Sequence, residues 1–370
     1  MTTEVAPAQP AILYQRAIRK MLDAQAFVLG GNDLSFKLEA SGYTDMLRVS
    51  LVGQWTTAAT KSFTKAELPH GIAKKFLVNA GKRGEPINIS GRMLRIVNVT
   101  DNDFGTFPVP AVPPDGSGDD SNPTYAAQID GFPVVAGAAE APTVNQFRLN
   151  WVVPFHRSVV DHMGALPTGG MVDTYLKVSP ANGLGEFLAP VAGSALTDIS
   201  AFSATMTVEQ VYYTAPPADA NVQPGTEGDG WMIKLDETDD AIERAGIAAK
   251  IAIDPTDTIL AIYHSVSCGG KRDSSVIDRL YLQVGDSYFT DPAGIDGAQK
   301  TLDDASEHGR PMPDGVFVWD RDLPSTGMAG WIHTDGIRKI EVGITAITGT
   351  DVSAATVKTA TKRLVQLVAA

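Results

Sequence analysis

Apolar and polar residues alternate along much of this chain, as they do in β-strands with one buried face. Segment 46–55 is typical, because Leu47, Val49 and Leu51 would lie on one side of an extended chain. Similar runs predict strands at 35–40, 72–80, 86–91, 93–99, 147–155, 173–180, 204–216, 250–254, 258–266, 275–284, 315–323 and 337–347. No dozen-residue helices separate these runs, as parallel crossovers would require, so we expect antiparallel sandwiches.

Two segments near the ends of the sequence have a different spacing. From residue 11 to 29, apolar residues recur at helical intervals, Pro10 suits a first turn, and a Gly-Gly pair ends the run. This pattern predicts a short N-terminal helix. The tail 352–368 is also compatible with a helix, against the weak helix propensity of its Thr and Val residues. Segment 238–246 has room for one or two helical turns.

Changes in composition suggest boundaries between domains. A stretch rich in Pro, Gly and Asp predicts a long exposed loop, and a second such stretch at 215–230 predicts a linker. We therefore divide the chain into an arm with a helix (1–34), a first sandwich (35–216) with a loop insertion (100–145), a linker (217–237), a second sandwich (238–350) and a tail (351–370).

The order of features in the first half recurs in the second. Helix-like segments, AIRKMLDA and AIERAG, precede the two sets of strands. The strand pairs are SFKLE with AKIAI, TDMLRVSLV with TDTILAIYH, GIAKKFLVNAG with SVIDRLYLQVG, FRLNWVVPF with VFVWDRDLP, and TYLKVS with RKIEVG. Identity within each pair is low, so two unrelated β domains remain the alternative to a duplication.

The net charge and the cysteine content limit the classes of function that this chain can have. The net charge is −13, so the acidic body disfavours direct binding of nucleic acid, although both termini are basic relative to it. The single cysteine, Cys268, excludes an internal disulfide framework and a cysteine-based zinc site. We see no signal-peptide pattern and no run of 18 apolar residues, and we expect a soluble protein made in a cytoplasm.

No group of residues has the spacing of a catalytic motif. HRSVVDH places His156, Asp161 and His162 close together, but not at the spacing of a zinc-protease helix. The run SCGGK at 267–271 lacks the first Gly of a phosphate-binding loop. Cys268 more often packs beside a strand than acts as a nucleophile. We therefore expect no enzyme and no catalytic, cofactor-binding or metal-binding residues.

Acidic clusters and tryptophans are the remaining candidates for binding sites. Oxygen-rich loops attract hard cations, but none of the clusters matches the twelve-residue calcium loop, so solvated acidic turns are expected. The five tryptophans are spread along the chain. This wide spacing favours a role as core or interface anchors over a sugar-binding platform. The clusters are Asp115, Asp119 and Asp120; Asp236, Glu237, Asp239 and Asp240; and Asp303, Asp304, Glu307 and His308.

Two tandem sandwiches, a basic helix before the first, and large loops at particular connections resemble the double jelly-roll major capsid proteins of tailless, membrane-containing icosahedral phages (tectivirus-like). The stretches that carry the resemblance are AILYQRAIRKMLDAQ, GIAKKFLVNAG, FRLNWVVPF, SVIDRLYLQVG and FVWDRDLP. The resemblance implies an all-β fold of two tandem jelly-roll sandwiches over residues 10–350. One departure is the second unit, whose strands span about 245–350, which is short for eight strands.

This resemblance implies a virion protein that forms homotrimers, and two sandwiches per chain would make each trimer a near-hexagonal tile. Its partners would be neighbouring trimers, vertex and minor capsid proteins, and the lipid of an internal membrane, with no direct contact to nucleic acid. The chain would be made in the host cytoplasm. Loop 100–145 would face outward and the termini inward. The alternatives are a virion spike or glycan- or receptor-binding sandwich protein and, less favoured, a polysaccharide-active enzyme.

The resemblance implies that the basic termini contact the lipid of the internal membrane. Each Lys or Arg near an anionic membrane contributes roughly 1 kcal/mol to binding. The alternative is that these side chains only solvate one face of a packed helix. The membrane-facing candidates are Arg16, Arg19 and Lys20, followed by Lys358, Lys362 and Arg363.

Overall fold

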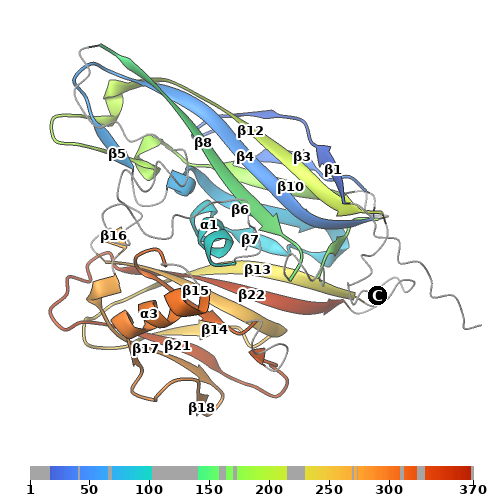
Figure 1. The fold of residues 1–370 in the computed structure, drawn as a ribbon, viewed down its shortest axis with the longest axis vertical. Helices are drawn as coiled ribbons and strands as arrows, with labels where there is room; N and C mark the ends of the chain where they lie inside the picture. Colours follow the sequence, from blue (N-terminus) through green and yellow to red (C-terminus); the bar gives the residue numbers. More distant parts are fainter. Residues whose placement is uncertain are drawn as a thin grey trace, which may run out of the picture.

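Long strands that alternate buried and exposed residues build two stacked β-sandwich units in the computed structural model of this chain (Figure 1). Strand β4 (Tyr43–Thr57) buries Leu47, Val49 and Leu51 on one face, as the sequence pattern predicts. The structure describes residues 17–40, 42–65, 69–101, 141–157, 164–169, 173–214, 230–268, 271–272, 274–308, 312–322 and 330–367.

The first unit packs two antiparallel sheets face to face. In one sheet, β12 lies between β4 and the short strands β1 and β2, while β8 and β9 pair with the other edge of β4. Its remaining strands are β1 (Ile18–Met21), β2 (Gln25–Phe27), β8 (Thr143–Pro154), β9 (Leu166–Pro167) and β12 (Ile199–Tyr213). The facing sheet comprises β3 (Leu34–Lys37), β10 (Thr174–Pro180), β6 (Ala73–Ala80) and β7 (Ile87–Ile89), in that order; β5 (Phe63–Lys65) and β11 (Leu188–Pro190) form a small separate sheet.

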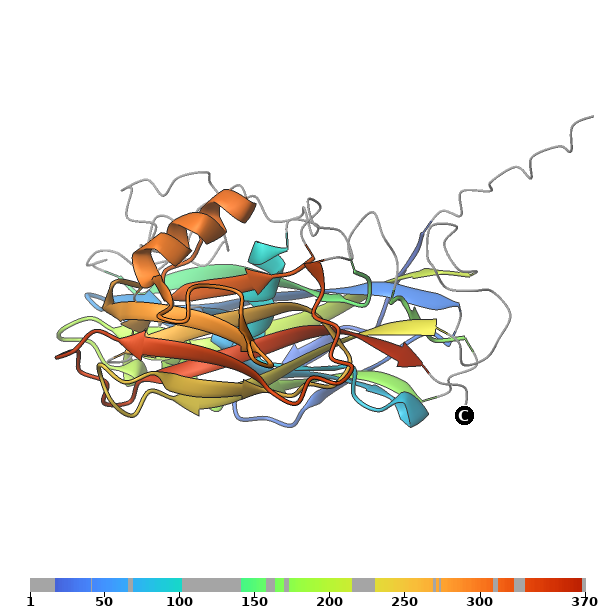
Figure 2. The same ribbon diagram turned by 90° about the horizontal axis from the view of Figure 1, so that it is seen from below.

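The second unit has the same two-layer plan. One layer comprises β13 (Gly230–Ala241), β22 (Thr356–Leu367), β15 (Thr258–Cys268), β16 (Lys271–Arg272) and β20 (Val316–Asp320). The other comprises β14 (Ala249–Ile253), β21 (Ile340–Ala346), β17 (Ile277–Val284), β18 (Ser287–Tyr288) and β19 (Ile295–Asp296). The described α-helices are α1 (Gly91–Thr100) and α3 (Gly297–His308), and α3 lies outside the layers of strands (Figure 2). Single 3-10 turns span Pro69–Ile72, Gly81–Arg83, Leu184–Glu186, Leu196–Asp198 and Ser274–Val276.

The two units are joined through one continuous sheet. Strand β13 pairs in parallel with β7, with Leu235 opposite Ile87, so the sheets of the two units merge into a nine-stranded sheet. The larger hydrophobic cluster also crosses the boundary, because it contains Leu235, Tyr263 and Val318 of the second unit. Backbone pairing and a shared apolar core therefore fix the orientation of one unit relative to the other.

The strand pairings reproduce the repeat predicted from the sequence. In the first unit β4 lies between β12 and β8, and in the second β15 lies between β22 and β20. Similarly, β10 lies between β3 and β6, and β21 between β14 and β17. All five strand pairs proposed from the sequence occupy equivalent places. Helix α1 also precedes β8 as α3 precedes β20. Two unrelated β domains would not share this order.

The N-terminal helix predicted for 11–29 is wrong where the structure describes it. Strands β1 and β2 occupy this region and pair antiparallel with β12. All four side chains of β1 are exposed, including Ile18 and Met21, so the apolar spacing does not define a buried helical face. The free edge of the long strand β12 supplies hydrogen-bond partners, and this pairing overrides a weak periodicity. Residues 11–16 lie outside the described residues.

Two further predictions are also wrong: that the linker extends to residue 237, and that the tail is helical. Residues 230–241 form β13 and residues 356–367 form β22, and the two strands pair antiparallel along their whole lengths. Neither the helical turns predicted for 238–246 nor the tail helix forms. The second unit therefore extends beyond 238–350 at both ends, which explains why it seemed short for a jelly roll. Residues 217–229 lie outside the described residues.

Two helices were missed. The run 93–99, predicted as a strand, lies in α1, where the Ser90 side chain accepts a hydrogen bond from the Met93 N–H at 3.3 Å. Every residue of α1 except Arg92 is buried, and a helix buried on all sides resembles a buried strand in its sequence pattern. The polar region containing Asp303 forms α3 instead of a loop. Of the predicted insertion 100–145, residues 102–140 lie outside the described residues.

Candidate assembly surfaces and the junction between the units

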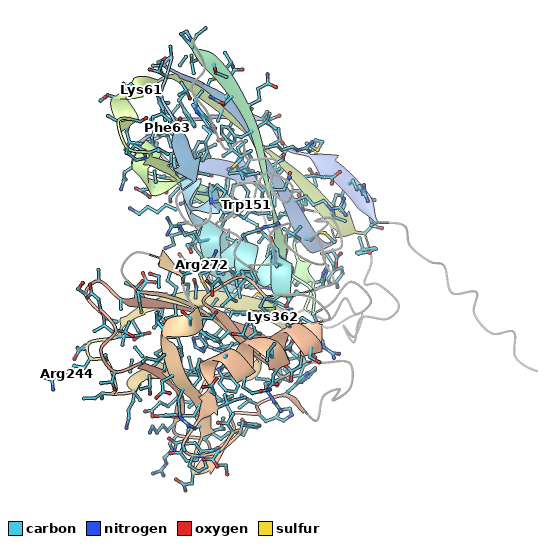
Figure 3. All side chains as sticks on the ribbon, turned by 60° about the vertical axis from the view of Figure 1, so that its left-hand side comes forward. Lys61, Phe63, Trp151, Arg244, Arg272 and Lys362 are labelled. Atoms are coloured by element: carbon cyan, nitrogen blue, oxygen red, sulfur yellow. The ribbon has the colours of Figure 1, made fainter. Side chains whose placement is uncertain are left out.

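A buried ionic cluster lies where the two units meet. Asp101, just after α1, accepts a hydrogen bond from the Tyr263 hydroxyl at 2.7 Å and another from Lys362 Nζ at 2.8 Å. Lys362 Nζ also donates to the backbone carbonyl of Arg157 at 3.0 Å. Tyr263 and Lys362 come from adjacent strands of the second unit, whereas Asp101 and Arg157 belong to the first. The cluster therefore links the units through charge-assisted hydrogen bonds. Figure 3 shows Lys362 at this boundary.

A second ion pair extends the cluster. The Arg157 guanidinium donates from Nε to both carboxylate oxygens of Asp322, at 2.7 and 2.8 Å. Trp331 Nε1 donates to the same carboxylate at 2.7 Å, and the Arg157 guanidinium stacks 4.9 Å from the Trp331 ring centre. Planar stacking and forked hydrogen bonding both favour Arg over Lys here. Together the two pairs hold one end of α1 and the segment after β8 against the second unit.

The surroundings of Lys362 and Tyr263 shift the pKa values of both side chains. Burial by itself lowers the pKa of Lys362, but the charge and hydrogen bond of Asp101 outweigh burial, and the pKa is raised. Burial, then the charge of Asp101, raises the pKa of Tyr263 well above its usual value. Lys362 therefore stays charged and Tyr263 stays neutral. Breaking such a buried pair costs more than forming it gains, because one charge is left unpaired.

The C-terminal membrane-facing candidates are corrected by this arrangement. Lys362 and Arg363 are 4% and 2% exposed, and each pairs with a carboxylate, Asp101 and Asp236 respectively. Buried on strand β22, they cannot contact a lipid surface. Lys358 is partly exposed, but its ammonium pairs with Glu237 at 3.1 Å and with Asp239 at 2.7 Å.

The N-terminal candidates have different surroundings. Arg19 and Lys20 lie on the exposed edge strand β1, and Lys20 forms an ion pair with Glu39. Arg16 lies outside the described residues. The structure therefore leaves Arg19 and Lys20 at the surface, on a strand instead of the predicted helix.

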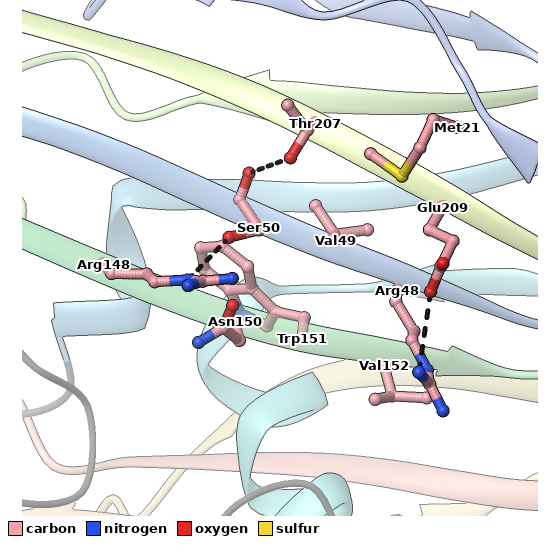
Figure 4. A pocket seen from close by; sticks show the side chains of 10 residues that line it. All are labelled: Met21, Arg48, Val49, Ser50, Arg148, Asn150, Trp151, Val152, Thr207 and Glu209. Carbon is pink, nitrogen blue, oxygen red and sulfur yellow. Dashed lines mark hydrogen bonds and ion pairs between the residues drawn. The ribbon is translucent and has the colours of Figure 1, made fainter.

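An open groove crosses the exposed face of the first unit's β1–β12–β4–β8 sheet (Figure 4). Its volume is about 520 Å³. Arg48 pairs with Glu209 at 3.6 Å, and Arg148 Nε donates to the Ser50 hydroxyl at 3.3 Å. Met21 of β1 lies along one side. The groove offers charge and hydrogen bonding on a broad sheet face, which suits protein contact. Of the tryptophans singled out from the sequence, Trp151 lines this groove.

Apolar side chains on the same sheet add to this surface. Met21, Val52 and Val144 are each 52% or more exposed on strands β1, β4 and β8. We call this exposed face of the sheet, with its groove, the sheet surface. Mixed polar and apolar surfaces of this kind are typical of protein–protein contacts.

The other sequence candidates have structural roles where they are described. His156 is fully buried, and its Nδ1 lies 2.7 Å from Asp45; its sequence neighbours Asp161 and His162 lie outside the described residues. Cys268 packs against the second unit's core. Trp55 and Trp151 are core residues of the first unit, as expected from the sequence (Figure 3 labels Trp151).

Several members of the acidic clusters are paired with basic side chains, and one cluster lies outside the described residues. Asp236, Glu237 and Asp239 bind the basic side chains of β22, and Asp304 pairs with Lys300 inside α3. Burial raises the pKa of Asp304 to about 6, against the lowering effect of Lys300. Asp115, with Asp119 and Asp120, lies outside the described residues. Within the described ranges, no group of three or more His, Cys, Asp or Glu side chains is arranged to hold a metal ion, and no helix is long and apolar enough to cross a membrane.

The residues of the junction were not found from the sequence. Asp101, Arg157 and Asp322 lie just beyond the ends of elements and follow no recognisable spacing. Lys362 could have been recognised from the sequence. If β22 is read as a strand, this lysine falls in a central strand, where a charge needs a partner. Reading the tail as a helix concealed this signal.

Comparison with known proteins relates this fold to viral capsids. No protein-family model and no curated protein sequence matches the chain. Among solved structures, the major capsid protein of Sulfolobus turreted icosahedral virus aligns with a TM-score of 0.67 and 12% identity, over 94% of this chain and 97% of that chain. The PBCV-1 capsid structure aligns with a TM-score of 0.61 and 10% identity, over 96% of each chain.

A phage protein is among the similar structures. The major capsid protein P2 from bacteriophage PM2 aligns with a TM-score of 0.53 and 10% identity, over 95% of this chain and 98% of that chain. These likenesses show that the chain has the double jelly-roll fold, which confirms the predicted fold class and the resemblance noted from the sequence. The similar structures are not restricted to phages, since the faustovirus major capsid protein is also among them, with a TM-score of 0.54.

Proposed function

We propose that this chain is a major capsid protein, a structural subunit that forms homotrimers in the shell of an icosahedral virion and has no enzymatic activity. The observation that carries the proposal is the duplication: two units of one topology are held as a single body by the β7–β13 pairing and a shared core. The architecture shared with solved capsid proteins over nearly the whole chain supports the same conclusion.

The duplication suggests why such a chain would trimerise. Three copies of a rigid two-unit chain present six similar lobes, so a three-fold assembly can occupy a near-hexagonal position in a lattice. The sheet surface supplies a candidate contact between neighbouring copies, because it combines exposed apolar residues with paired charges. Stable interfaces of this kind commonly bury about 2,000–5,000 Å². Further partners would be vertex and minor capsid proteins.

The decisive experiment measures oligomeric mass and assembly. Light scattering of the purified chain should give three times the 39.2 kDa of one copy, and electron microscopy should show hexagonal tiles, sheets or shells. Val52→Asp on the sheet surface should weaken assembly, whereas Leu302→Asp, a matched exposed position on α3, should leave it unchanged. A strict monomer that never assembles, alone or with virion proteins, would exclude the capsid role; saturable binding of a glycan would then favour a spike or receptor-binding protein.

We also propose that the N-terminal strand faces the lipid of an internal membrane. The support is the exposure of Arg19 and Lys20, together with the nearby basic residue Arg16 in the sequence. Replacing all three with Glu should reduce association with anionic vesicles and leave the trimer mass unchanged. Lys82→Glu, at an exposed turn, is the control. Equal vesicle binding by both variants would remove the membrane proposal without affecting the capsid one.

A further inference from the structure

The outer edge of β8 is an open edge of the first unit's sheet. β8 pairs with β4 over twelve residues without a register shift, and within the described ranges no strand lies on its other side. The strand contains no Lys, its Pro is the last residue, and Arg148 is its one charged residue. Natural proteins usually interrupt such edges with Pro, Lys, a bulge or a covering element, because a regular open edge can pair with another strand.

Two sets of hydrogen bonds show which backbone groups of β8 face this edge. The Asn98 side chain, from α1, donates to the Val152 carbonyl and accepts from the Val152 N–H, both at 2.8 Å. On the β4 side, the Phe155 N–H donates to the Asp45 carbonyl. Backbone groups alternate in direction along an antiparallel strand, so the even-numbered residues of β8 face outward. Those between 144 and 150 have no backbone partner among the described residues.

This open stretch is symmetric about Phe147. At one end Pro142 has no N–H to donate, and at the other the Asn98 amide occupies both backbone groups of Val152. Figure 4 shows two of the outward-facing residues, Arg148 and Asn150, on β8. The full set is Val144, Gln146, Arg148 and Asn150.

The equivalent edge in the second unit is closed. The Val318 N–H of β20 donates to the Asp304 carboxylate at 3.0 Å, and the Val318 carbonyl accepts from Lys300; both side chains belong to α3. The Val316 N–H donates to the Pro313 carbonyl at 3.1 Å. Helix α3 and the segment before β20 therefore cover that edge, whereas α1 covers one end of the β8 edge and leaves the rest open.

We propose that the β8 edges of two copies of this chain pair antiparallel about a two-fold axis at Phe147. This register uses the whole open stretch, and each facing pair of residues exchanges two hydrogen bonds. Gln146 lies opposite Arg148 of the second copy, and Val144 lies opposite Asn150. The two guanidinium groups are therefore not directly opposed.

Other registers of the same pairing are less favourable. A shift of two residues in one direction places the two Arg148 side chains directly opposite each other, and like charges in that position are destabilising. A shift of two residues in the other direction brings Pro142, which has no N–H, into the ladder. The self-complementary register is the argument for a second copy as the partner.

In the proposed shell, this contact joins neighbouring trimers. A two-fold contact uses the same patch on both chains, whereas the contacts around a three-fold axis join different patches. The place of the contact in the shell therefore rests on the proposed function, while the pairing itself does not.

Charge variants at Gln146 test the register. Gln146→Glu places a carboxylate opposite Arg148 of the second copy twice per contact, so it should tighten association of the purified chain by about twofold to thirtyfold. Gln146→Lys should weaken association by a similar factor. Analytical ultracentrifugation over a range of concentrations measures both. The same changes at Ser35, exposed on the edge strand β3 of the facing sheet, should leave association unchanged. Equal association of the two Gln146 variants would overturn the pairing.

The masks of the two hypotheses differ in the same experiment, because trimers and pairs have different masses. Trimers that associate further, with no difference between the Gln146 variants, would exclude the β8 pairing and leave the capsid role in place. Dimers that respond to the variants, in a chain that never forms trimers, would support the pairing and exclude the trimeric subunit.

Residue-resolved hydrogen exchange locates the contact. The Gln146 and Arg148 amides should exchange at least about fivefold more slowly in the associated protein than in the dilute one, whereas the Phe147 amide, which faces β4, should be slow in both. Gln146→Pro removes an outward N–H and no bond to β4, so it should abolish this slowing with little change in thermal stability. Slowing that appears only after other virion proteins are added would assign the edge to a different partner and overturn self-pairing.

Discussion

The first strands of the two units occupy the same place in the repeat but have different surroundings. In the first unit, β1 and β2 are short and pair with β12 on one side. In the second, β13 is a continuous strand of twelve residues with β22 on one side and β7 on the other. A duplicated unit therefore gains a central strand where the first copy has an edge strand, because the first copy itself supplies the additional neighbour.

The same contrast appears in the charges. Lys20 on β1 pairs with Glu39 at the surface, whereas Lys362 on β22, the partner strand of β13, pairs with Asp101 inside the junction. Exposed ion pairs contribute little because water and salt screen them. Removing one member of a buried pair is strongly destabilising, since the other charge is left with neither a partner nor water. At the junction, the basic side chain of Lys362 on β22 is therefore part of the buried core.

The largest effect is expected from breaking the buried pair. Lys362→Met should destabilise the chain by about 3–5 kcal/mol, because the Asp101 carboxylate stays buried without its cation. Lys20→Met should have no measurable effect. Urea unfolding of both variants measures the contrast. Adding Asp101→Asn to Lys362→Met should recover part of the loss; no recovery would show that the packing of the lysine chain matters more than its charge.

Truncating the central strand should have the next largest effect. Leu235 of β13 is fully buried in the cluster that crosses the units, so Leu235→Ala should cost about 2–5 kcal/mol. Met21 of β1 is 59% exposed, and Met21→Ala should fall within about 0.5 kcal/mol of the wild type. Thermal unfolding checks both. Similar losses for the two variants would mean that the edge strand is covered, as contact with another copy would do.

The smallest effect is expected at the helix caps, which also occupy equivalent places. Ser90 accepts from the Met93 N–H at the start of α1, and Asp296 accepts from the Ala298 N–H at 2.9 Å at the start of α3. Replacing either with Ala should cost about 0.5–2 kcal/mol. The loss at Ser90 should be the larger, because α1 is buried between the units whereas α3 exposes one face. A larger loss at Asp296 would place more of the core around α3 than its burial indicates.

Local sequence patterns determined the strands and their order. The alternation in 46–55 predicted β4 because one face of that strand is buried and the other is not. Strand β15 is buried on both faces from Ile259 to His264, so its sequence 258–266 is a nearly continuous apolar run. The five strand pairs predicted the duplication for the same reason, since equivalent strands keep equivalent patterns. The pattern also led to the double jelly-roll class, although short-range motifs contributed nothing.

Tertiary structure decided the ends of the chain, the helices and the junction. Segments 17–29 and 352–368 have spacing compatible with helices, but the open edges of β12 and β13 offered backbone partners that only the assembled sheets provide. Asp101 and Lys362 lie far apart in the sequence, and each is an ordinary charged residue until folding removes water from around its side chain. Alternation records which face of a strand is buried; which charges share that burial depends on how the two units meet.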